Sequence, residues 1–331
     1  MIKPLVLFTA GLAASTLAAA SALALDTRRV EVRQFIKEMQ RDHGFDRKQL
    51  THLLAQAETK QAILDAISRP AERVIPWFEY RDRFLTEKRI LQGTDFWVAH
   101  AKRLTDIKED GIASTVAGIL GVETSYGRQT GRYRVLDALA TLAFDYPPRG
   151  DFFRSELQQF LILAREEAVD PKTALGSYAG AMGAPQFISS SYRNFAVDAD
   201  GDGHRDLWSN WDDVIGSVAN YLRVSGWRDG EPVVVMAQMP DAADMTRFDT
   251  SKIELNETVQ SLRDKGVRFD TTLAADAPAM LVVAQGKDGP EYRVGFNNFF
   301  VITRYNRSNM YAMAVHDLGQ AVRAFMRDAE K

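Results

Sequence analysis

Apolar side chains recur every three to four residues along much of the chain, a spacing that places them on one face of a helix. This pattern predicts helices across residues 26–110, where the remaining positions are polar or charged. It also predicts helices over residues 151–168, from residue 212 or 213 onward, and over residues 310–326. Acidic side chains accept hydrogen bonds from the free amides of a first helical turn, so Asp151 and either Asp212 or Asp213 are expected N-caps.

The pattern changes after Gly230, where β-branched and other apolar residues form short runs typical of strands. The runs span residues 232–236, 279–283 and 292–296, and Asp288-Gly289 before the last is typical of a hairpin turn. Residues 176–187 are too rich in glycine for a regular helix and predict a loop whose backbone closely approaches another group. The fold class predicted is α+β, mainly α.

Composition limits the class of protein. The 331 residues are 46% hydrophobic, enough for a large core divided into two or three lobes. The net charge is −3 and no basic run is present, which argues against nucleic acid as a partner. The chain has no cysteine, which excludes disulfides, thiolate metal sites, a cysteine nucleophile and a lipid-bearing cysteine.

Residues 1–24 have the pattern of a secretory signal. Lys3 precedes an apolar run, and both Ala20-Ser21-Ala22 and Ala22-Leu23-Ala24 fit a small-x-small cleavage site. An uncleaved membrane anchor is the alternative, since the run is close to spanning length. We expect cleavage and a soluble periplasmic or secreted protein without a membrane anchor.

Glu123 occupies a position where a helix should be apolar. It follows Ile112, Val116 and Ile119 on one stripe, and Gly127 is expected to end the helix shortly after it. Apolar surroundings raise the pKa of a carboxyl, and a carboxyl still protonated near neutral pH can act as a general acid. The alternative is a structural ion pair with Arg128 or Arg132.

Residues 198–204 match the start of an EF-hand calcium loop, with carboxylates at positions 1, 3 and 5, Gly at position 6 and a backbone carbonyl at position 7. These positions are Asp198, Asp200, Asp202, Gly203 and His204. Ser209 replaces the usual position-12 Glu, so Asp212 or Asp213, the nearest later carboxylates, is expected to close the site. A structural calcium ion is predicted, with sodium or magnesium as alternative ions. The alternative without a bound ion is a solvated turn of Asp and Gly residues.

Five segments together resemble the lytic murein transglycosylase B family, glycosidases of the bacterial wall. The first is Gly121-Val122-Glu123-Thr124-Ser125-Tyr126-Gly127, and the others follow in the family's order. They are Leu136 to Leu142, Gly180 to Gly183 through Gln186-Phe187, Asp198 to Trp208, and Tyr305 to Ser308 with Tyr311.

The resemblance implies a lysozyme-like catalytic core with a helical N-terminal lobe and a small β lobe. We expect the signal over residues 1–24, the helical lobe over 25–110 and the core over 111–228. The β lobe is expected over 229–300, and a segment at the substrate cleft with the C-terminal helix over 301–331.

The resemblance also implies cleavage between N-acetylmuramic acid and N-acetylglucosamine without water, which leaves 1,6-anhydro ends. Glu123 matches the family's sole acid/base. Substrate contacts are implied for Ser177, Gln186, Tyr221, Tyr305, Asn306, Tyr311 and Arg149. Pro148 replaces the second member of a family arginine pair. Core or capping roles are the alternatives for the serine, the tyrosines and Asn306.

No cofactor is expected to take part in the chemistry. The partner implied is the peptidoglycan glycan strand, with proteins of wall synthesis or division as further candidates. The lone acid of the motif favours assistance by the substrate's 2-acetamido group. A hydrolytic muramidase and a non-catalytic wall-binding protein are the competing hypotheses.

Overall fold

The computed structural model describes residues 23–68, 75–107, 110–240 and 244–329. The predicted signal over residues 1–24 therefore lies outside the described residues, except for Leu23 and Ala24, which form strand β1. Among the helices of the described part, none is both long enough and apolar enough to cross a membrane.

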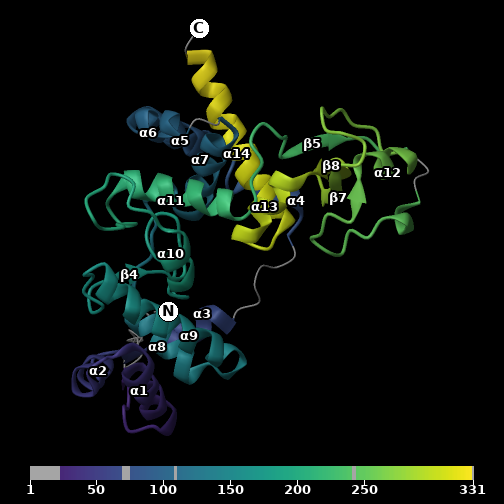
Figure 1. The fold of residues 1–331 in the computed structure, drawn as a ribbon. Helices are drawn as coiled ribbons and strands as arrows, with labels where there is room; N and C mark the ends of the chain where they lie inside the picture. The colour runs from purple at the N-terminus through teal and green to yellow at the C-terminus, as the bar shows by residue number, and fades with distance from the viewer. Residues whose placement is uncertain (1–22, 69–74, 108–109, 241–243, 330–331) are drawn as a thin grey trace, which may run out of the picture.

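The helices form two halves, stacked one above the other in Figure 1. The lower half holds α1 (Val30–His43), α2 (Arg47–Leu54), α3 (Gln61–Ser68), α8 (Val135–Asp145), α9 (Gly150–Glu166) and α10 (Ser189–Phe195). The upper half holds α4 (Trp77–Asp82), α5 (Glu87–Ala99), α6 (Ala101–Asp106), α7 (Asp110–Thr124), α11 (Trp211–Val224), α13 (Asn297–Tyr305) and α14 (Asn309–Ala329). The chain thus passes from the lower half to the upper half, returns for α8 to α10, and ends in the upper half.

Helix α8 is the centre of the lower half, because all its residues from Val135 to Phe144 are buried. It packs against α9, α3 and strand β2 (Glu58–Thr59), which pairs with β1. The buried carboxylate of Asp137 accepts a hydrogen bond from the Glu58 amide at 2.9 Å and forms ion pairs with Lys60 and Arg134. Asp137 therefore fastens the N-terminal segment to α8, which gives one of the motif segments a structural role.

Helices α7 and α14 form the core of the upper half and approach each other closely at two glycines. A Cβ at Gly118 of α7 would lie 2.1 Å from the Val315 carbonyl oxygen, and one at Gly319 of α14 would lie 2.2 Å from the Ser114 carbonyl oxygen. Any larger residue at either position would force the helices apart. This close packing fixes the end of α7 relative to the start of α14.

The four-stranded antiparallel sheet lies to one side of the upper half (Figure 1) and has the order β5-β8-β7-β6. The strands are β5 (Val234–Ala237), β6 (Glu257–Thr258), β7 (Pro278–Gln285) and β8 (Pro290–Gly295). Side chains alternate along β7: Ala279 and Leu281 join a small core beneath α12 (Val259–Asp264), while Met280 and Val282 join the main core. The predicted strands and the Asp288-Gly289 turn between β7 and β8 are confirmed.

The remaining elements are short. They are β3 (Tyr133–Arg134), which pairs with β4 (Leu175–Gly176), and the 3₁₀ turns η1 (Pro147–Arg149) and η2 (Met245–Arg247).

Both N-caps predicted from the sequence are wrong. Helix α9 begins at Gly150, because η1 runs directly into it, and Asp151 lies inside the first turn. The cap of α11 is Asn210, whose side-chain oxygen accepts hydrogen bonds from the amides of Asp212 and Asp213. Asparagine caps a helix as well as aspartate does, so the nearest acid was a poor guide.

Candidate functional site

Glu123 lies in the last turn of α7, next to the start of α14. Ile112, Val116 and Ile119 are fully buried, as the stripe predicted, and Glu123 itself is partly buried. Loss of solvent raises the pKa of the Glu123 carboxyl from its ordinary 4.5 to about 7, although a hydrogen bond from Tyr311 opposes the shift. Near neutral pH this group is poised between proton donor and proton acceptor.

Tyr311 is the polar partner of Glu123. Its hydroxyl donates to Glu123 Oε1 at 2.7 Å, and burial holds the Tyr311 pKa well above the ordinary 10, so the hydroxyl keeps its proton. Arg128 instead donates to the Ser125 carbonyl, and Arg132 lies over the Tyr133 ring. Within the described residues Glu123 forms no ion pair, so the structural Arg–Glu pair is not observed.

A tight turn follows Glu123 and fixes the end of α7. Helix α7 ends at Thr124, three residues before the predicted Gly127, because Ser125 and Tyr126 already adopt left-handed backbone angles, with φ of 52° and 58°. The Thr124 hydroxyl donates to the Ala184 carbonyl at 2.8 Å and accepts from the Gly127 amide at 3.0 Å. The turn thereby joins the helix carrying Glu123 to the glycine-rich loop.

The glycine-rich loop closely approaches the backbone of the protein itself. A Cβ at Gly183 would lie 2.1 Å from the Leu207 carbonyl oxygen, which explains the small residue there. Ser177 Oγ accepts hydrogen bonds from the amides of Ala179 and Ala181, and Gln186 Nε2 donates to the carbonyls of Thr130 and Gly183. Ser177 and Gln186 thus stabilise the loop, and contact with substrate stays a prediction for both.

Three of the predicted tyrosines lie side by side although they come from α11, α13 and α14. The rings of Tyr221 and Tyr305 have centroids 4.8 Å apart, and those of Tyr305 and Tyr311 are stacked at 6.4 Å. The Tyr305 hydroxyl donates to the Pro185 carbonyl at 2.5 Å and the Tyr221 hydroxyl to that of Arg304 at 2.7 Å. The row of rings leads away from Glu123, and Asn306, which is exposed, directly follows α13.

Arg149 lies in a different part of the molecule. It belongs to η1, which packs against α8 and α9, and its guanidinium lies 4.3 Å from the centroid of the exposed Phe152 ring. Its recorded ring contacts are with Phe152 and Phe153 and not with the tyrosines. Among the described residues Arg149 therefore makes no hydrogen bond, ion pair or ring contact with Glu123 or the tyrosines, and its part in substrate binding stays a prediction.

Thr124 belongs to the Glu123 motif but was not singled out within it, and the sequence did not indicate the carbonyl groups of Ala184 and Pro185 that receive the hydroxyls of Thr124 and Tyr305. Every residue has a carbonyl, so no pattern of side chains could single these two out. The position of Thr124 directly after the acid was the only available signal.

The acidic loop after α10 folds as the EF-hand pattern predicts. Carboxylate oxygens of Asp198, Asp200 and Asp202 all lie within 4.8 Å of one another, and all three residues are exposed. Asp198 accepts hydrogen bonds from the amides of Gly201, Asp202 and Gly203, which lower its pKa. Ligands on opposite sides of a calcium ion are about 5 Å apart, so this cluster fits such an ion.

Asp213 joins the two ends of this loop. It is fully buried, and its two oxygens accept hydrogen bonds from the amides of Ala199 and Asp206, each at 2.7 Å. Asn210, the cap of α11, also donates to Asp200 Oδ2 at 2.8 Å. Between the two acids left open by the sequence, Asp213 is therefore the one built into the loop, while ligation by Asp213 and by His204 stays a prediction.

The chain matches the family described as transglycosylase SLT domain over residues 27–320. It is 41% identical over 300 residues to membrane-bound lytic murein transglycosylase B of Escherichia coli strain K12, covering 87% of this chain and 81% of that protein.

Solved structures agree with this match. The catenated lytic transglycosylase SltB1 from Pseudomonas aeruginosa is 51% identical, with a TM-score of 0.86 over 89% of this chain and 98% of that one. The Escherichia coli lytic transglycosylase Slt35, solved in complex with calcium and with bulgecin A, is 38% identical, with a TM-score of 0.82 over 92% and 96%. SltB3 from Pseudomonas aeruginosa, solved with NAG-NAM-pentapeptide and NAG-anhNAM-pentapeptide, is 30% identical, with a TM-score of 0.77 over 88% and 78%.

Proposed function

Because the chain belongs to the lytic murein transglycosylases with an SLT domain, lyases that act on peptidoglycan, we propose that it cleaves the bond between N-acetylmuramic acid and N-acetylglucosamine and leaves 1,6-anhydro ends. Glu123 is the sole acid/base in this proposal. The observation that carries it is the partly buried Glu123 carboxyl, with its pKa raised to about 7 and Tyr311 as its hydrogen-bond donor.

Protonated Glu123 gives its proton to the bridging oxygen as the glycosidic bond breaks. The glycosidic bond breaks at the anomeric carbon of the muramic acid. The carbonyl oxygen of that sugar's 2-acetamido group attacks this carbon and stabilises the developing positive charge, which removes the need for a second carboxylate. The leaving sugar departs with the proton from Glu123.

In the second step the ionised Glu123 takes the proton of the C6 hydroxyl, and that oxygen attacks the anomeric carbon and displaces the acetamido oxygen. The product ring contains one water fewer than a hydrolysed end, and Glu123 has its proton back. A pKa near 7 suits both steps, since the same group must donate and accept at similar pH. The Tyr311 hydroxyl supports the ionised form between the two steps.

The proposal places the sugar row along Tyr221 and Tyr305, whose side chains are partly buried, while the fully buried Tyr311 acts through its hydrogen bond to Glu123. Asn306, Ser177, Gln186 and Arg149 are the further contacts proposed. SltB3 binds NAG-anhNAM-pentapeptide, a fragment with the product ring proposed for this chain. Aromatic rings offer apolar faces to sugars, and the hydroxyl contacts with Pro185 and Arg304 hold two of the rings in place.

A structural calcium ion in the Asp198 loop is part of the same proposal. Slt35 is solved in complex with calcium, and here three carboxylates converge on one point. The ion would neutralise their mutual repulsion and would be held by Asp198, Asp200 and Asp202, with His204 and Asp213 as further candidates. It would brace the loop and takes no part in bond cleavage.

We place the protein in the periplasm, where its substrate lies. The export pattern over residues 1–24 and the absence of a cysteine for lipid attachment support this location. Fractionation of cells should recover the protein with the periplasmic contents after cleavage near residues 22–24. Recovery of an uncleaved chain in the membrane fraction would contradict it.

The test of the reaction is digestion of purified sacculi, followed by mass spectrometry of the released fragments. We expect muramic acid ends lighter by one water than hydrolysed ends. Only reducing muramic acid ends would replace the proposal with a muramidase, and binding to sacculi without any release would indicate a wall-binding protein.

A further inference from the structure

A pocket of about 430 Å³ lies at one end of the tyrosine row, since Tyr221 lines it and Tyr305 and Tyr311 do not. Its volume is within the range of small-ligand sites, roughly 300–1,000 Å³. Residues from α10, α11, α13 and the segment between η2 and β6 line it, so it lies where the sheet meets the helices. We call it the arginine pocket, after Arg304 and Arg307 in its lining.

The wall of the arginine pocket is aromatic. Phe195 and Phe300 line it together with Tyr221, and the rings of Phe195 and Tyr221 meet edge to face at 4.8 Å. The same Tyr221 ring contacts Tyr305 at 4.8 Å. Tyr221 therefore belongs both to the candidate sugar row and to the lining of the arginine pocket. A ligand that extends past the Tyr221 ring can bind in the sugar row and in the arginine pocket at the same time.

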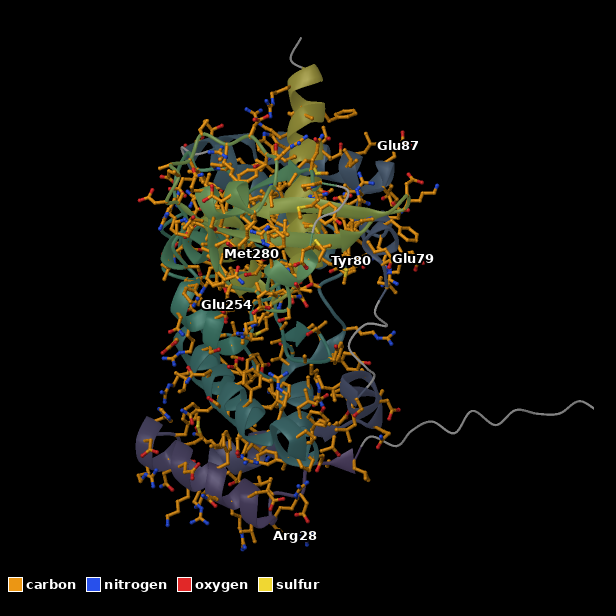
Figure 2. The ribbon with its side chains drawn as sticks, turned by 90° about the vertical axis from the view of Figure 1, so that its right-hand side faces the viewer. Arg28, Glu79, Tyr80, Glu87, Glu254 and Met280 are labelled. Carbon is orange, nitrogen blue, oxygen red and sulfur yellow. The ribbon has the colours of Figure 1, made fainter. Side chains whose placement is uncertain are left out.

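The lining also carries two arginines, Arg304 and Arg307, against a single acid, Glu254. Arg304 and Arg307 are exposed, and neither forms an ion pair with any carboxylate in the described part of the chain. Other arginines of this protein are paired, as Arg193 is with Glu166 and Arg293 with Asp317. Glu254 lines the same pocket, and Figure 2 shows it below Met280 of the sheet, at the level where the two halves meet.

We propose that the arginine pocket binds the carboxylates of the peptide stem that a muramic acid in the sugar row carries, an inference that rests on the proposed function. A stem of five residues, as in the NAG-NAM-pentapeptide bound by SltB3, spans about 17 Å when extended. The ring centroids are 6.4 Å apart between Tyr311 and Tyr305 and 4.8 Å apart between Tyr305 and Tyr221. Each distance is less than half the length of the extended stem, so a stem that starts in the sugar row is long enough to pass Tyr221. Guanidinium groups bind carboxylates through paired hydrogen bonds, while the apolar wall receives the aliphatic side chains.

The kinetic test compares glycan strands with stems and the same strands after an amidase has removed the stems. The variant is the double substitution Arg304→Gln and Arg307→Gln, which keeps the backbone carbonyl of Arg304 that Tyr221 uses. We expect KM for stem-bearing strands to rise about tenfold with kcat unchanged, and no change on stem-free strands. An equal rise on both substrates, or no rise on either, would overturn the proposal.

Arg83→Gln is the matched control. Arg83 is exposed and directly follows α4, whose Glu79 and Tyr80 lie on the opposite side of the upper half from Glu254 in Figure 2. Its kinetics should equal those of the unsubstituted protein on both substrates. Equal melting temperatures of the double variant and the control show that any effect is not a loss of folding.

A titration separates this inference from the reaction itself. The free pentapeptide stem should bind the unsubstituted protein, while a stem with its carboxylates amidated, or the double variant, should show at least tenfold weaker binding. If the protein cleaves neither kind of strand, the proposed reaction fails, and the titration still decides the arginine pocket. Equal binding of the charged and amidated peptides would rule out recognition of carboxylates.

Discussion

The Glu123 site and the Asp198 loop both depend on carboxylates, yet their surroundings drive the acids in opposite directions. Glu123 is a single, partly buried acid whose pKa is raised by loss of solvent. Asp198 is exposed, and three backbone amides lower its pKa and hold it ionised. Loss of solvent thus favours the protonated form of one carboxyl, while backbone donors favour the ionised form of the other.

The two sites also differ in how they are supported. Glu123 depends on contacts between segments far apart in sequence, above all on Tyr311, whereas the loop around Asp198 is held mainly by its own amides. Substitutions at the first site should therefore change chemistry, and those at the second should change stability.

Glu123→Gln should abolish release of anhydro ends from sacculi, because an amide keeps the shape of the side chain but cannot deliver a proton. The loss should be at least ~10²–10⁴-fold, since one group serves both steps. Glu79→Gln, at an exposed acid of α4, is the control and should keep full activity. Near-normal release by Glu123→Gln would remove Glu123 from the mechanism.

Glu123 should also make the protein less stable as pH rises. Its native pKa of about 7 exceeds the ordinary 4.5, so between these values the native state holds a proton that the unfolded chain has lost. Stability contributed by the protonated form is therefore complete below pH 4.5 and is lost progressively up to about pH 7, by about 3 kcal/mol. In urea titrations at several pH values, Glu123→Gln should lack this decline, and an unchanged slope would contradict the raised pKa.

Asp200→Ala should remove the stabilisation that calcium gives. An ion that binds only the native state at a hundred times its dissociation constant adds about 3 kcal/mol. Melting curves of the unsubstituted protein should therefore differ between calcium and chelator, while those of Asp200→Ala should coincide. Asp229→Ala, at an exposed acid outside the loop, should behave like the unsubstituted protein. Coincident curves for all three would argue against an occupied site.

Tyr311→Phe should shift the pH dependence of kcat/KM. The hydroxyl lowers the Glu123 pKa by donating to the ionised form, so its removal raises that pKa further. Because the first step needs protonated Glu123, activity falls as pH rises through the pKa, and this fall should move to higher pH by roughly one unit. A lower overall rate with an unmoved profile would mean that Tyr311 acts only through the substrate.

Thr124→Val should have the smallest effect. It removes the hydrogen bond to the Ala184 carbonyl and should lower the free energy of unfolding by about 1–2 kcal/mol. Thr105→Val is the control, because the exposed Thr105 hydroxyl donates a hydrogen bond within its own helix, and it should lower the free energy of unfolding by less. Equal losses for the two variants would mean that the link from α7 to the glycine-rich loop adds no stability.

Local patterns predicted the elements well and the contacts between them poorly. The helical stripes, the three strands, the hairpin and the acidic loop follow from spacing within a few residues, and all are observed. The caps at Asp151 and Asp212 or Asp213 failed because the backbone path before a helix selects its cap. That path depends on η1 in one case and on the acidic loop in the other.

In the candidate site, too, local features could be predicted from the sequence and contacts between distant segments could not. The raised pKa of Glu123 could be predicted from its apolar stripe, which is local. The resemblance implied only a substrate contact for Tyr311, and its hydrogen bond to Glu123 was not predicted, because 188 positions separate the two residues and only the packing of α7 on α14 brings them together. The hydroxyl contacts of Tyr305 and Tyr221 with backbone carbonyls had no signal in the sequence.

The order in which the chain visits the two halves has a consequence for its synthesis. Helix α14, the last described element, covers α7 and supplies the hydroxyl that Glu123 uses. A chain that stops before residue 309 lacks Tyr311 and leaves the apolar face of α7 open to water. The contact between Tyr311 and Glu123 can therefore form only after the last described helix has been made, and an incomplete copy of this enzyme lacks an assembled Glu123 site.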